Sequence, residues 1–200
     1  DPLESNMIEF GGKSSWFKES LYVTLAFYKI KEKNSLYSAN DSSNIDLMRA
    51  IGEQESKGIE IDLNGRITNQ WSISAAYSFN EASITDSPIA SEIGRQKPNT
   101  PKHQGNIWTR YNFTDGALKD FGLAFGSNFV TTRTLSNNDT QTIPGYTVMN
   151  AALYYTINKF KIQLNANNIA NKTYWVGGYD YIRLFPGAPK NWLLTLGYSF

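Results

Sequence analysis

The sequence has 200 residues, a formal net charge of +1 and no cysteine. The absence of cysteine excludes disulfides and thiolate metal sites. A near-neutral charge without a run of Lys or Arg gives no basic surface for nucleic acid, so we exclude that partner. Aromatic residues make up 14% of the chain, and their positions become informative once strands are assigned.

A membrane-spanning helix is also excluded, because no apolar run approaches the about 18 residues that such a helix needs. Mean hydropathy is −0.43. A membrane β-barrel is compatible with this value, because only every second residue of its strands faces lipid. The segment Asp1–Ser5 does not resemble a signal peptide, so we expect any targeting segment to lie upstream.

Alternation of apolar and polar residues is the dominant pattern along the chain. Ile59, Ile61 and Leu63 are apolar, while Glu60 and Asp62 between them are polar. This alternation is typical of a strand with one apolar and one polar face. It predicts an all-β chain of about nine strands, at residues 7–16, 20–33, 55–67, 70–84, 102–114, 119–134, 145–157, 159–169 and 191–200.

The predicted connections alternate in length. Short turns are expected at 18–19, 69–70, 115–117 and 158–159, and long connections at 34–54, 86–101, 135–144 and 170–190. Short turns at one rim and long loops at the other are typical of an antiparallel up-and-down barrel in the outer membrane. A soluble β-sandwich is the alternative, but it does not account for this alternation.

Aromatic residues bracket the apolar faces, as Trp71 and Phe79 do in one strand and Trp192 and Phe200 do in the last. Aromatic girdles at the two membrane interfaces have this arrangement. Strands of about ten residues also match the length that a tilted strand needs to cross hydrocarbon. We therefore favour the membrane barrel over the sandwich.

Several motifs, in the right order, resemble TonB-dependent siderophore receptors from about Phe10 to Phe200. Lys57 and Lys190 stand where that family more often has Arg, so they keep the charge and lose the bidentate geometry. The matching segments are Ser56–Ile61, Trp71–Ser78, Pro101–Gln104, Ile143–Tyr146, Leu164–Tyr174, Phe185–Lys190 and Leu196–Phe200.

The resemblance implies a place in the bacterial outer membrane, surrounded by membrane lipid. Residues 1–200 would be the C-terminal part of a 22-stranded transmembrane barrel, with the plug domain and the N-terminal barrel strands outside this sequence. Phe200 resembles the terminal aromatic that the outer-membrane assembly machinery recognises. If Phe200 ends at the periplasmic rim, the long connections are extracellular.

The resemblance also implies energy-dependent uptake of a ferric siderophore, driven by contact between the TonB complex and the missing N-terminal region. The iron arrives already chelated, so we expect no metal site and no cofactor of the protein. Hydroxamate, catecholate and citrate-type chelates all remain compatible with the loops, and relatives also import cobalamin or haem. Candidate ligand-binding residues in the loops are Arg95, Tyr174, Trp175, Tyr179 and Tyr181.

Aromatic side chains would bury the chelate, and a guanidinium would pair with its oxygens. The alternative for Tyr174 and Trp175 is a place in the outer aromatic girdle.

We expect no enzymatic activity, because the sequence has no Gly-x-Ser-x-Gly motif and no evident catalytic triad. His103 is the only histidine, and a polar place in the barrel wall is favoured over a metal ligand. The alternative function is a self-contained small outer-membrane barrel. It would act as an adhesin, or as a hydrolase at the rim with His103 as its base.

Overall fold

The computed structural model of the chain describes residues 2–38, 43–44, 46–137, 141–179 and 182–200. Nine strands form one antiparallel sheet in chain order. They are β1 (Glu4–Trp16), β2 (Leu21–Ser38), β3 (Met48–Arg66), β4 (Trp71–Asp86), β5 (His103–Asn112), β6 (Phe121–Val130), β9 (Tyr146–Ile157), β10 (Phe160–Asn167) and β13 (Asn191–Tyr198).

Two small hairpins lie outside this sheet: β7 (Arg133–Thr134) with β8 (Thr142–Ile143), and β11 (Trp175–Gly178) with β12 (Leu184–Pro186). Two helical turns, η1 (Ala90–Glu92) and η2 (Gly116–Leu118), complete the described elements. Neither helical turn is long or apolar enough to cross a membrane. The predicted all-β meander is therefore confirmed.

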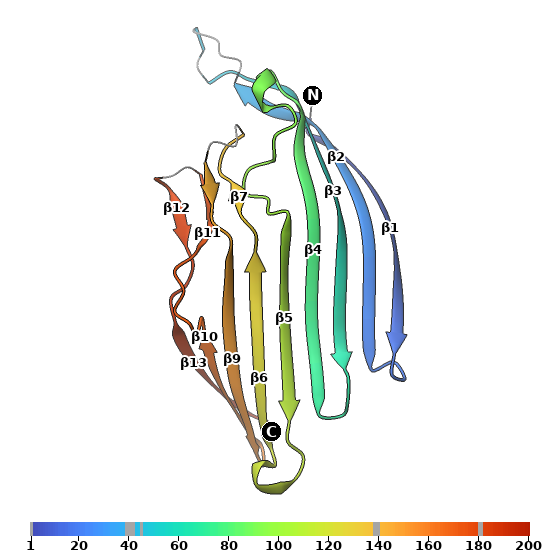
Figure 1. The fold of residues 1–200 in the computed structure, drawn as a ribbon, viewed down its shortest axis with the longest axis vertical. Helices are drawn as coiled ribbons and strands as arrows, with labels where there is room; N and C mark the ends of the chain where they lie inside the picture. Colours follow the sequence, from blue (N-terminus) through green and yellow to red (C-terminus); the bar gives the residue numbers. More distant parts are fainter. Residues whose placement is uncertain (1, 39–42, 45, 138–140, 180–181) are drawn as a thin grey trace.

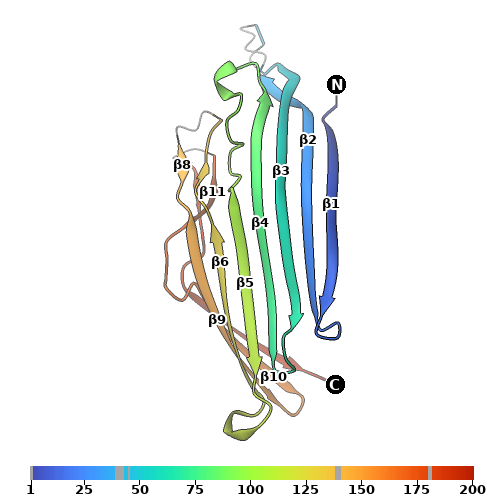
Figure 2. The ribbon, with the colours of Figure 1, turned by 45° about the vertical axis from the view of Figure 1, so that its right-hand side comes forward.

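The short and long connections lie at opposite ends of the sheet. Figure 1 shows the turns β1–β2, β3–β4, β5–β6 and β9–β10 at the bottom, which we call the short-turn end. Both small hairpins and η1 lie at the top, which we call the long-loop end. Figure 2 shows the same separation from a second direction. The predicted alternation of connection lengths is confirmed.

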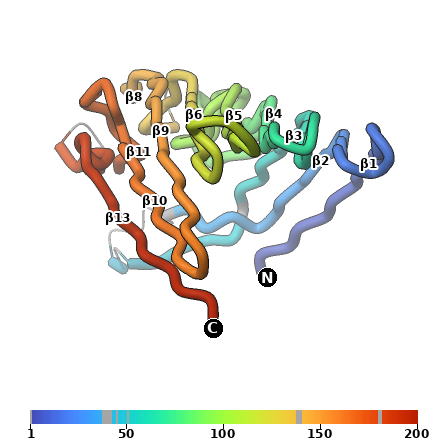
Figure 3. The backbone as a smooth tube through the Cα atoms, turned by 90° about the horizontal axis from the view of Figure 1, so that it is seen from below, coloured from blue at the N-terminus to red at the C-terminus, as the bar shows by residue number. Residues whose placement is uncertain are grey.

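Seen along the strands, the sheet is a curved wall that does not close (Figure 3). Its first and last strands, β1 and β13, each pair with one neighbour. An unpaired strand edge in hydrocarbon costs several kcal/mol per group, so spanning sheets close into barrels. The wall has the geometry of part of a barrel.

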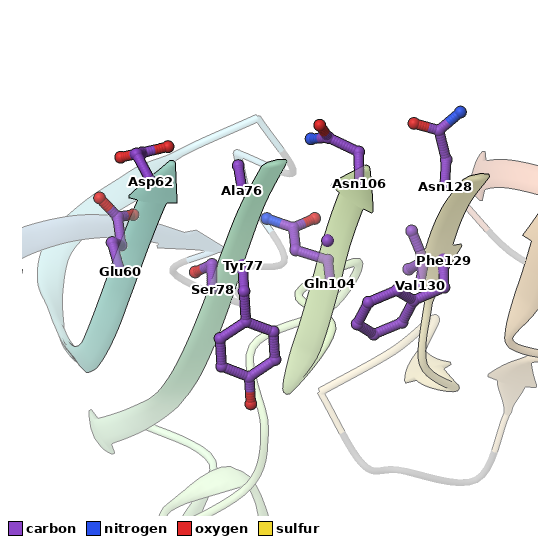
Figure 4. A pocket seen from close by; sticks show the side chains of 11 residues that line it. Glu60, Asp62, Ala76, Tyr77, Ser78, Gln104, Asn106, Asn128, Phe129 and Val130 are labelled. Carbon is purple, nitrogen blue, oxygen red and sulfur yellow. The ribbon is translucent and has the colours of Figure 1, made fainter. Parts of the chain in front are cut away.

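Alternation along each strand gives the wall an apolar face and a polar face. The register places Ile61, Tyr77 and Phe129 on the apolar face, since paired residues share a face. Ile61 and Tyr77 are more than a third exposed. Figure 4 shows Tyr77 projecting away from Asp62, which lies on the polar face. Exposed apolar side chains on one continuous face indicate a lipid-facing surface.

Aromatic rows bound the apolar face. Near the long-loop end one row pairs Phe10, Phe27, Ile59, Phe79 and His103 across five strands. Trp71 lies eight residues before Phe79 on β4, toward the short-turn end. Eight steps of about 3.3 Å make about 26 Å along the strand, or about 20 Å across the membrane at a tilt of about 40°. That height is close to the apolar band of an outer-membrane barrel.

Two predicted strands are longer in the structure than the sequence indicates. β2 continues to Ser38 and β3 begins at Met48, whereas residues 34–54 were expected to be a connection. The added residues, 34–38 of β2 and 48–54 of β3, show no regular alternation of apolar and polar residues. Cross-strand pairing, including the Lys31–Glu53 ion pair of 2.9 Å, holds them extended above the apolar band.

The predicted strand 119–134 ends early, because β6 stops at Val130 and Arg133–Thr134 turns into the β7–β8 hairpin. The hydroxyl of Thr131 donates to the carbonyl of His103 and accepts from its N–H, both at 3.1 Å. This side-chain pairing marks where the ladder between β5 and β6 is lost. The chain is then free to bend toward the loops.

The lipid-facing assignment can be tested with Leu63→Arg in the full-length protein. Leu63 lies on the apolar face between the aromatic rows, opposite Val23 and Ala75. An arginine near mid-membrane should destabilise the barrel by about 2–4 kcal/mol. The measurement is the urea midpoint of refolding into lipid vesicles. Asn64→Arg, one residue on and on the polar face, is the control, and equal losses would contradict the assignment.

Candidate ligand-binding loops

The long connection between β4 and β5, residues 87–102, folds back along β4 instead of leaving the wall. The N–H of Ile84 donates to the carbonyl of Arg95 at 3.0 Å, and the N–H of Lys97 donates to the carbonyl of Ala82 at 3.0 Å. The hydroxyl of Ser87, 8% exposed, donates to the carboxylate of Glu92 at 2.8 Å and fixes the turn before η1. This connection is therefore an ordered part of the long-loop end.

Asn99 joins three connections at one point. Its N–H donates to the carbonyl of Thr134 at 2.8 Å. Its amide Nδ2 donates to the carbonyl of Gly178 at 2.8 Å, and its Oδ1 accepts the Gly178 N–H at 3.2 Å. Its φ is +59°, which asparagine adopts more readily than most residues. Asn99 thus ties the 87–102 connection to β7 through its backbone and to β11 through its side chain.

Arg133 makes the second link between the hairpins. Its Nη2 donates to the carbonyl of Trp175 at 2.8 Å, and its guanidinium carbon lies 5.9 Å from the centre of the Tyr146 ring. Arg133 is 3% exposed, and burial lowers the pKa of its guanidinium. No salt bridge to Arg133 occurs within the described ranges. Aromatic and carbonyl contacts therefore compensate this buried charge in part, while its Nη1 is buried with no hydrogen-bond partner among the described residues.

Tyr174 packs against the wall. Its ring centre lies 4.6 Å from that of Tyr146, and its carbonyl accepts the N–H of Gly187 at 2.9 Å. A side chain at position 187 would overlap the Tyr174 ring, so glycine is needed there.

Asn168, which is 2% exposed, holds the base of the same connection through hydrogen bonds with Asn150, Lys172 and Ala188.

A cavity of about 330 Å³ opens beneath this connection on the polar face of the wall. Its wall is uncharged, and amide side chains and two tyrosines supply its polar groups. The lining residues are Asn128, Tyr146, Val148, Asn150, Asn167, Asn168, Tyr174, Val176, Ala188 and Asn191. A ligand at this position would meet hydrogen-bonding groups and flat rings instead of a charge.

A second cavity, of about 430 Å³, is lined by residues of β3, β4, β5 and β6. Its polar side presents Glu60, Asp62, Gln104 and Asn106 from β3 and β5 (Figure 4). These side chains leave the sheet on the face opposite Tyr77. The interior of an outer-membrane barrel is polar in this way.

The predicted ligand-binding residues fall into two groups. Tyr174 and Trp175 are half-buried and belong to the packed base of the last connection. Tyr179 is 68% exposed, with its ring edge against Phe185 at 5.3 Å and the Arg183 guanidinium over it at 5.5 Å.

Arg95 is exposed, and its Nε donates to the carbonyl of Ser91 at 3.4 Å. It lies on the connection between β4 and β5, while Tyr179 lies on the connection between β10 and β13. Tyr181 falls outside the described residues. Which of these residues contact a ligand stays a prediction.

His103 begins β5, as expected, but its ring lies on the apolar face. Its Nδ1 is 2.8 Å from the hydroxyl of Tyr77, and its ring centre is 5.1 Å from that of Phe79. A tyrosine, and not a serine, is its hydrogen-bond partner. Within the described part of the chain, no group of three or more His, Asp or Glu could hold a metal ion.

Phe200 lies at the short-turn end, where the chain terminates (Figure 1). Its ring stands edge-on to Tyr198 at 5.3 Å and is fully exposed. The position fits the predicted assembly signal, which stays a prediction.

A curved wall with one lipid-facing surface, short turns at one end and interlocked loops at the other defines part of a transmembrane β-barrel. Comparison with known proteins identifies the family to which this barrel belongs. Residues 1–169 match the family model described as TonB dependent receptor-like, beta-barrel. The chain belongs to this family, and it lies in the outer membrane.

Similar proteins are receptors from several bacteria. The metal-pseudopaline receptor CntO of Pseudomonas aeruginosa is 29% identical over 203 residues, which cover 100% of this chain and 28% of CntO. The ferrioxamine B receptor of Salmonella typhimurium is 25% identical, covering 100% of this chain and 29% of that protein. The chain thus spans under a third of the curated relatives it matches.

Solved structures agree on the fold. The siderophore receptor PiuA from Acinetobacter baumannii superposes with a TM-score of 0.85 at 24% identity, covering 97% of this chain and 28% of PiuA. The closed form of the ferric-catecholate import receptor Fiu from E. coli K12 gives 0.83 at 25% identity, covering 100% and 28%. The nine strands therefore correspond to a portion of a receptor barrel.

The two residues that interlock the loops are not evident in the sequence. Arg133 lies within the predicted strand 119–134, and Asn99 is one polar residue among several in the predicted connection 86–101. The pairing of Asn99 with Gly178 spans 79 residues, so no local pattern indicates it. The only local indication was the segment Lys97–Pro101, in which an asparagine beside two prolines favours a turn.

The role of Asn99 can be tested with Asn99→Gly in the complete receptor. Glycine keeps the positive φ and removes both side-chain bonds to Gly178. Amide hydrogen exchange in Trp175–Gly178 should accelerate about fivefold or more, as expected for losing about 1 kcal/mol of hydrogen bonding. Exchange in β3 and β4 is the internal control. Unchanged exchange in β11 would show that Asn99 does not hold the hairpin.

Proposed function

We propose that this chain supplies the C-terminal strands and the outer loops of a TonB-dependent receptor that imports a ferric siderophore. The observation that carries the proposal is the family match over residues 1–169, together with relatives whose names describe siderophore receptors. In this proposal the remaining barrel strands and a plug domain belong to the rest of the protein. The protein itself contributes no cofactor, and the chelated iron is cargo.

The long-loop end is the extracellular end in this proposal. The connections there are interlocked by Asn99 and Arg133, and Tyr179 is presented outward. A rigid base with an exposed aromatic tip favours capture of a bulky chelate, because less side-chain and loop freedom is lost on binding. Below the loops, the uncharged cavity of about 330 Å³ offers a second contact for a ligand moving inward.

Transport would follow contact between the TonB complex and an N-terminal segment, which rearranges the plug. This chain would act as the fixed wall, because its strands form an unbroken ladder from β1 to β13. The same chain is proposed to have no catalytic role. His103 pairs with Tyr77 on the lipid-facing surface, a position that does not favour hydrolysis at the rim.

The proposed function can be tested by uptake of radioactive iron in cells whose other siderophore receptors are deleted. The probes are iron loaded on ferrioxamine B, on a catecholate siderophore and on a pyoverdine. At least one should be accumulated, and accumulation should stop when TonB is removed. Accumulation that continues without TonB would contradict the proposal, and failure with all three, and with ferric citrate as a fourth probe, would contradict a siderophore as the cargo.

The contribution of the last loop can be tested with Tyr179→Ala. Removing an exposed aromatic contact should lower affinity for the accepted chelate about three- to tenfold, with no change in thermal stability. Binding is measured by quenching of tryptophan fluorescence. Tyr22→Ala, which removes a similarly exposed tyrosine near the short-turn end, is the matched control. Equal affinities of the two variants would exclude Tyr179 from the binding surface.

A further inference from the structure

At the long-loop end, the lipid-facing surface of the wall changes from apolar to charged between one row of residues and the next. Phe27, Ile59 and Phe79 form the last apolar row, in which each residue pairs with the next across the sheet. Two residues further along each strand, the paired residues are Lys29, Lys57 and Glu81. Because residues two apart share a face, both rows lie on the same surface. The edge of the hydrocarbon contact is therefore bordered by lysines.

Lys29 and Lys57 are direct cross-strand partners. Like charges placed opposite each other destabilise a sheet. Each ammonium leans toward a carboxylate of the adjoining strand: Lys29 lies 3.0 Å from Glu55 and Lys57 lies 3.4 Å from Glu81. The lysine side chains are 56% and 57% exposed, whereas Glu55 is 22% exposed. Glu81 is 46% exposed, so the lysine is the more exposed partner in both ion pairs.

The acidic residues become more frequent farther from the apolar row. Lys31 is in register with Glu55, and the next row pairs Lys33 with Glu4 and Glu53. The excess of positive charge is therefore confined to the row next to the apolar face. A general solvent-exposed ion-pair network has no reason to show this order.

A cavity of about 360 Å³ adjoins Lys57 on this side of the wall. Lys102 lines it as a third cation, and Ser83 and Gln96 add hydrogen-bonding groups. Its other lining residues are Glu55, Glu81, Ala82 and Gly94. The cavity has room for a headgroup beside the Lys29 and Lys57 pair.

We propose that Lys29, Lys57 and Lys102 bind the phosphate of an anionic membrane lipid in the leaflet at the long-loop end. Phosphate oxygens would relieve the repulsion between Lys29 and Lys57. The acyl chains would lie against Phe27, Ile59 and Phe79 directly below. A lipid fits better than a free anion, because the cations border an apolar surface that only an amphiphile can cover at the same time. The site does not depend on which cargo the receptor carries.

The test uses the full-length receptor in non-ionic detergent, with bound lipid counted by native mass spectrometry. The probe is diphosphoryl lipid A, and phosphatidylcholine is the zwitterionic comparison. The wild type should retain lipid A in preference to phosphatidylcholine. The double variant Lys29→Gln with Lys57→Gln should bind lipid A at least roughly tenfold more weakly, because each lysine near a lipid surface contributes a several-fold effect.

Two controls separate this site from general electrostatics and from misfolding. Lys13→Gln with Lys161→Gln removes the same charge from the polar face, where Lys13 pairs with Thr24 and Lys161 pairs with Gly197. This variant should bind like the wild type. Lys29→Arg with Lys57→Arg keeps both charges and should retain binding. Heat-modifiable mobility in gels verifies that every variant is folded.

Equal weakening in the two glutamine double variants would overturn the proposal, as would unchanged binding in Lys29→Gln with Lys57→Gln. Inorganic phosphate is a second probe. If it competed with lipid A at concentrations equal to those of the lipid, the apolar row would play no part, and the lipid assignment would be wrong. Iron uptake by the double variant is recorded separately, because its loss or retention concerns the transport function and not this site.

Discussion

Backbone hydrogen bonding in a medium without water is the constraint on which the rest of this structure depends. A peptide group left unpaired in hydrocarbon costs several kcal/mol, so each spanning strand must be paired along its whole length on both sides. The seven strands between β1 and β13 have a neighbour on both sides and so meet this requirement. Long strands, short turns and one lipid-facing surface all follow from it. The two remaining edges, on β1 and β13, require pairing partners of their own.

The ladder also separates the tasks of the two faces. Because side chains alternate, the same strands offer apolar groups to lipid and polar groups to the interior. Residues beyond the aromatic row, toward the long-loop end, no longer face hydrocarbon and need not be apolar. This explains why β2 and β3 continue there as charged strands. The boundary between Phe27 and Lys29 is thus both the edge of the membrane contact and the place where lipid headgroups meet the protein.

The loops are not bound by the requirement for backbone pairing, because water is available at the ends of the strands. They can leave the sheet, and they are ordered instead by specific polar contacts from Asn99, Arg133 and Asn168. Such contacts depend on both partners being in place, and several join segments far apart in the chain. The wall and the loops therefore tolerate different substitutions. A position in the wall accepts residues of the polarity that its face requires, whereas a few loop positions require one particular residue.

The sequence by itself determined the all-β meander, the two faces and the order of short and long connections, because period-two alternation is local and strong. Its ordered motifs, such as Ser56–Ile61 and Leu196–Phe200, also indicated the family to which the chain belongs. Only the tertiary structure decided where β2 ends and β3 begins, that Arg133 leaves the sheet, and that Asn99 contacts Gly178. These features depend on pairing across many intervening residues, and neither the Lys29–Lys57 register nor the loop contacts leave a periodic pattern in the chain.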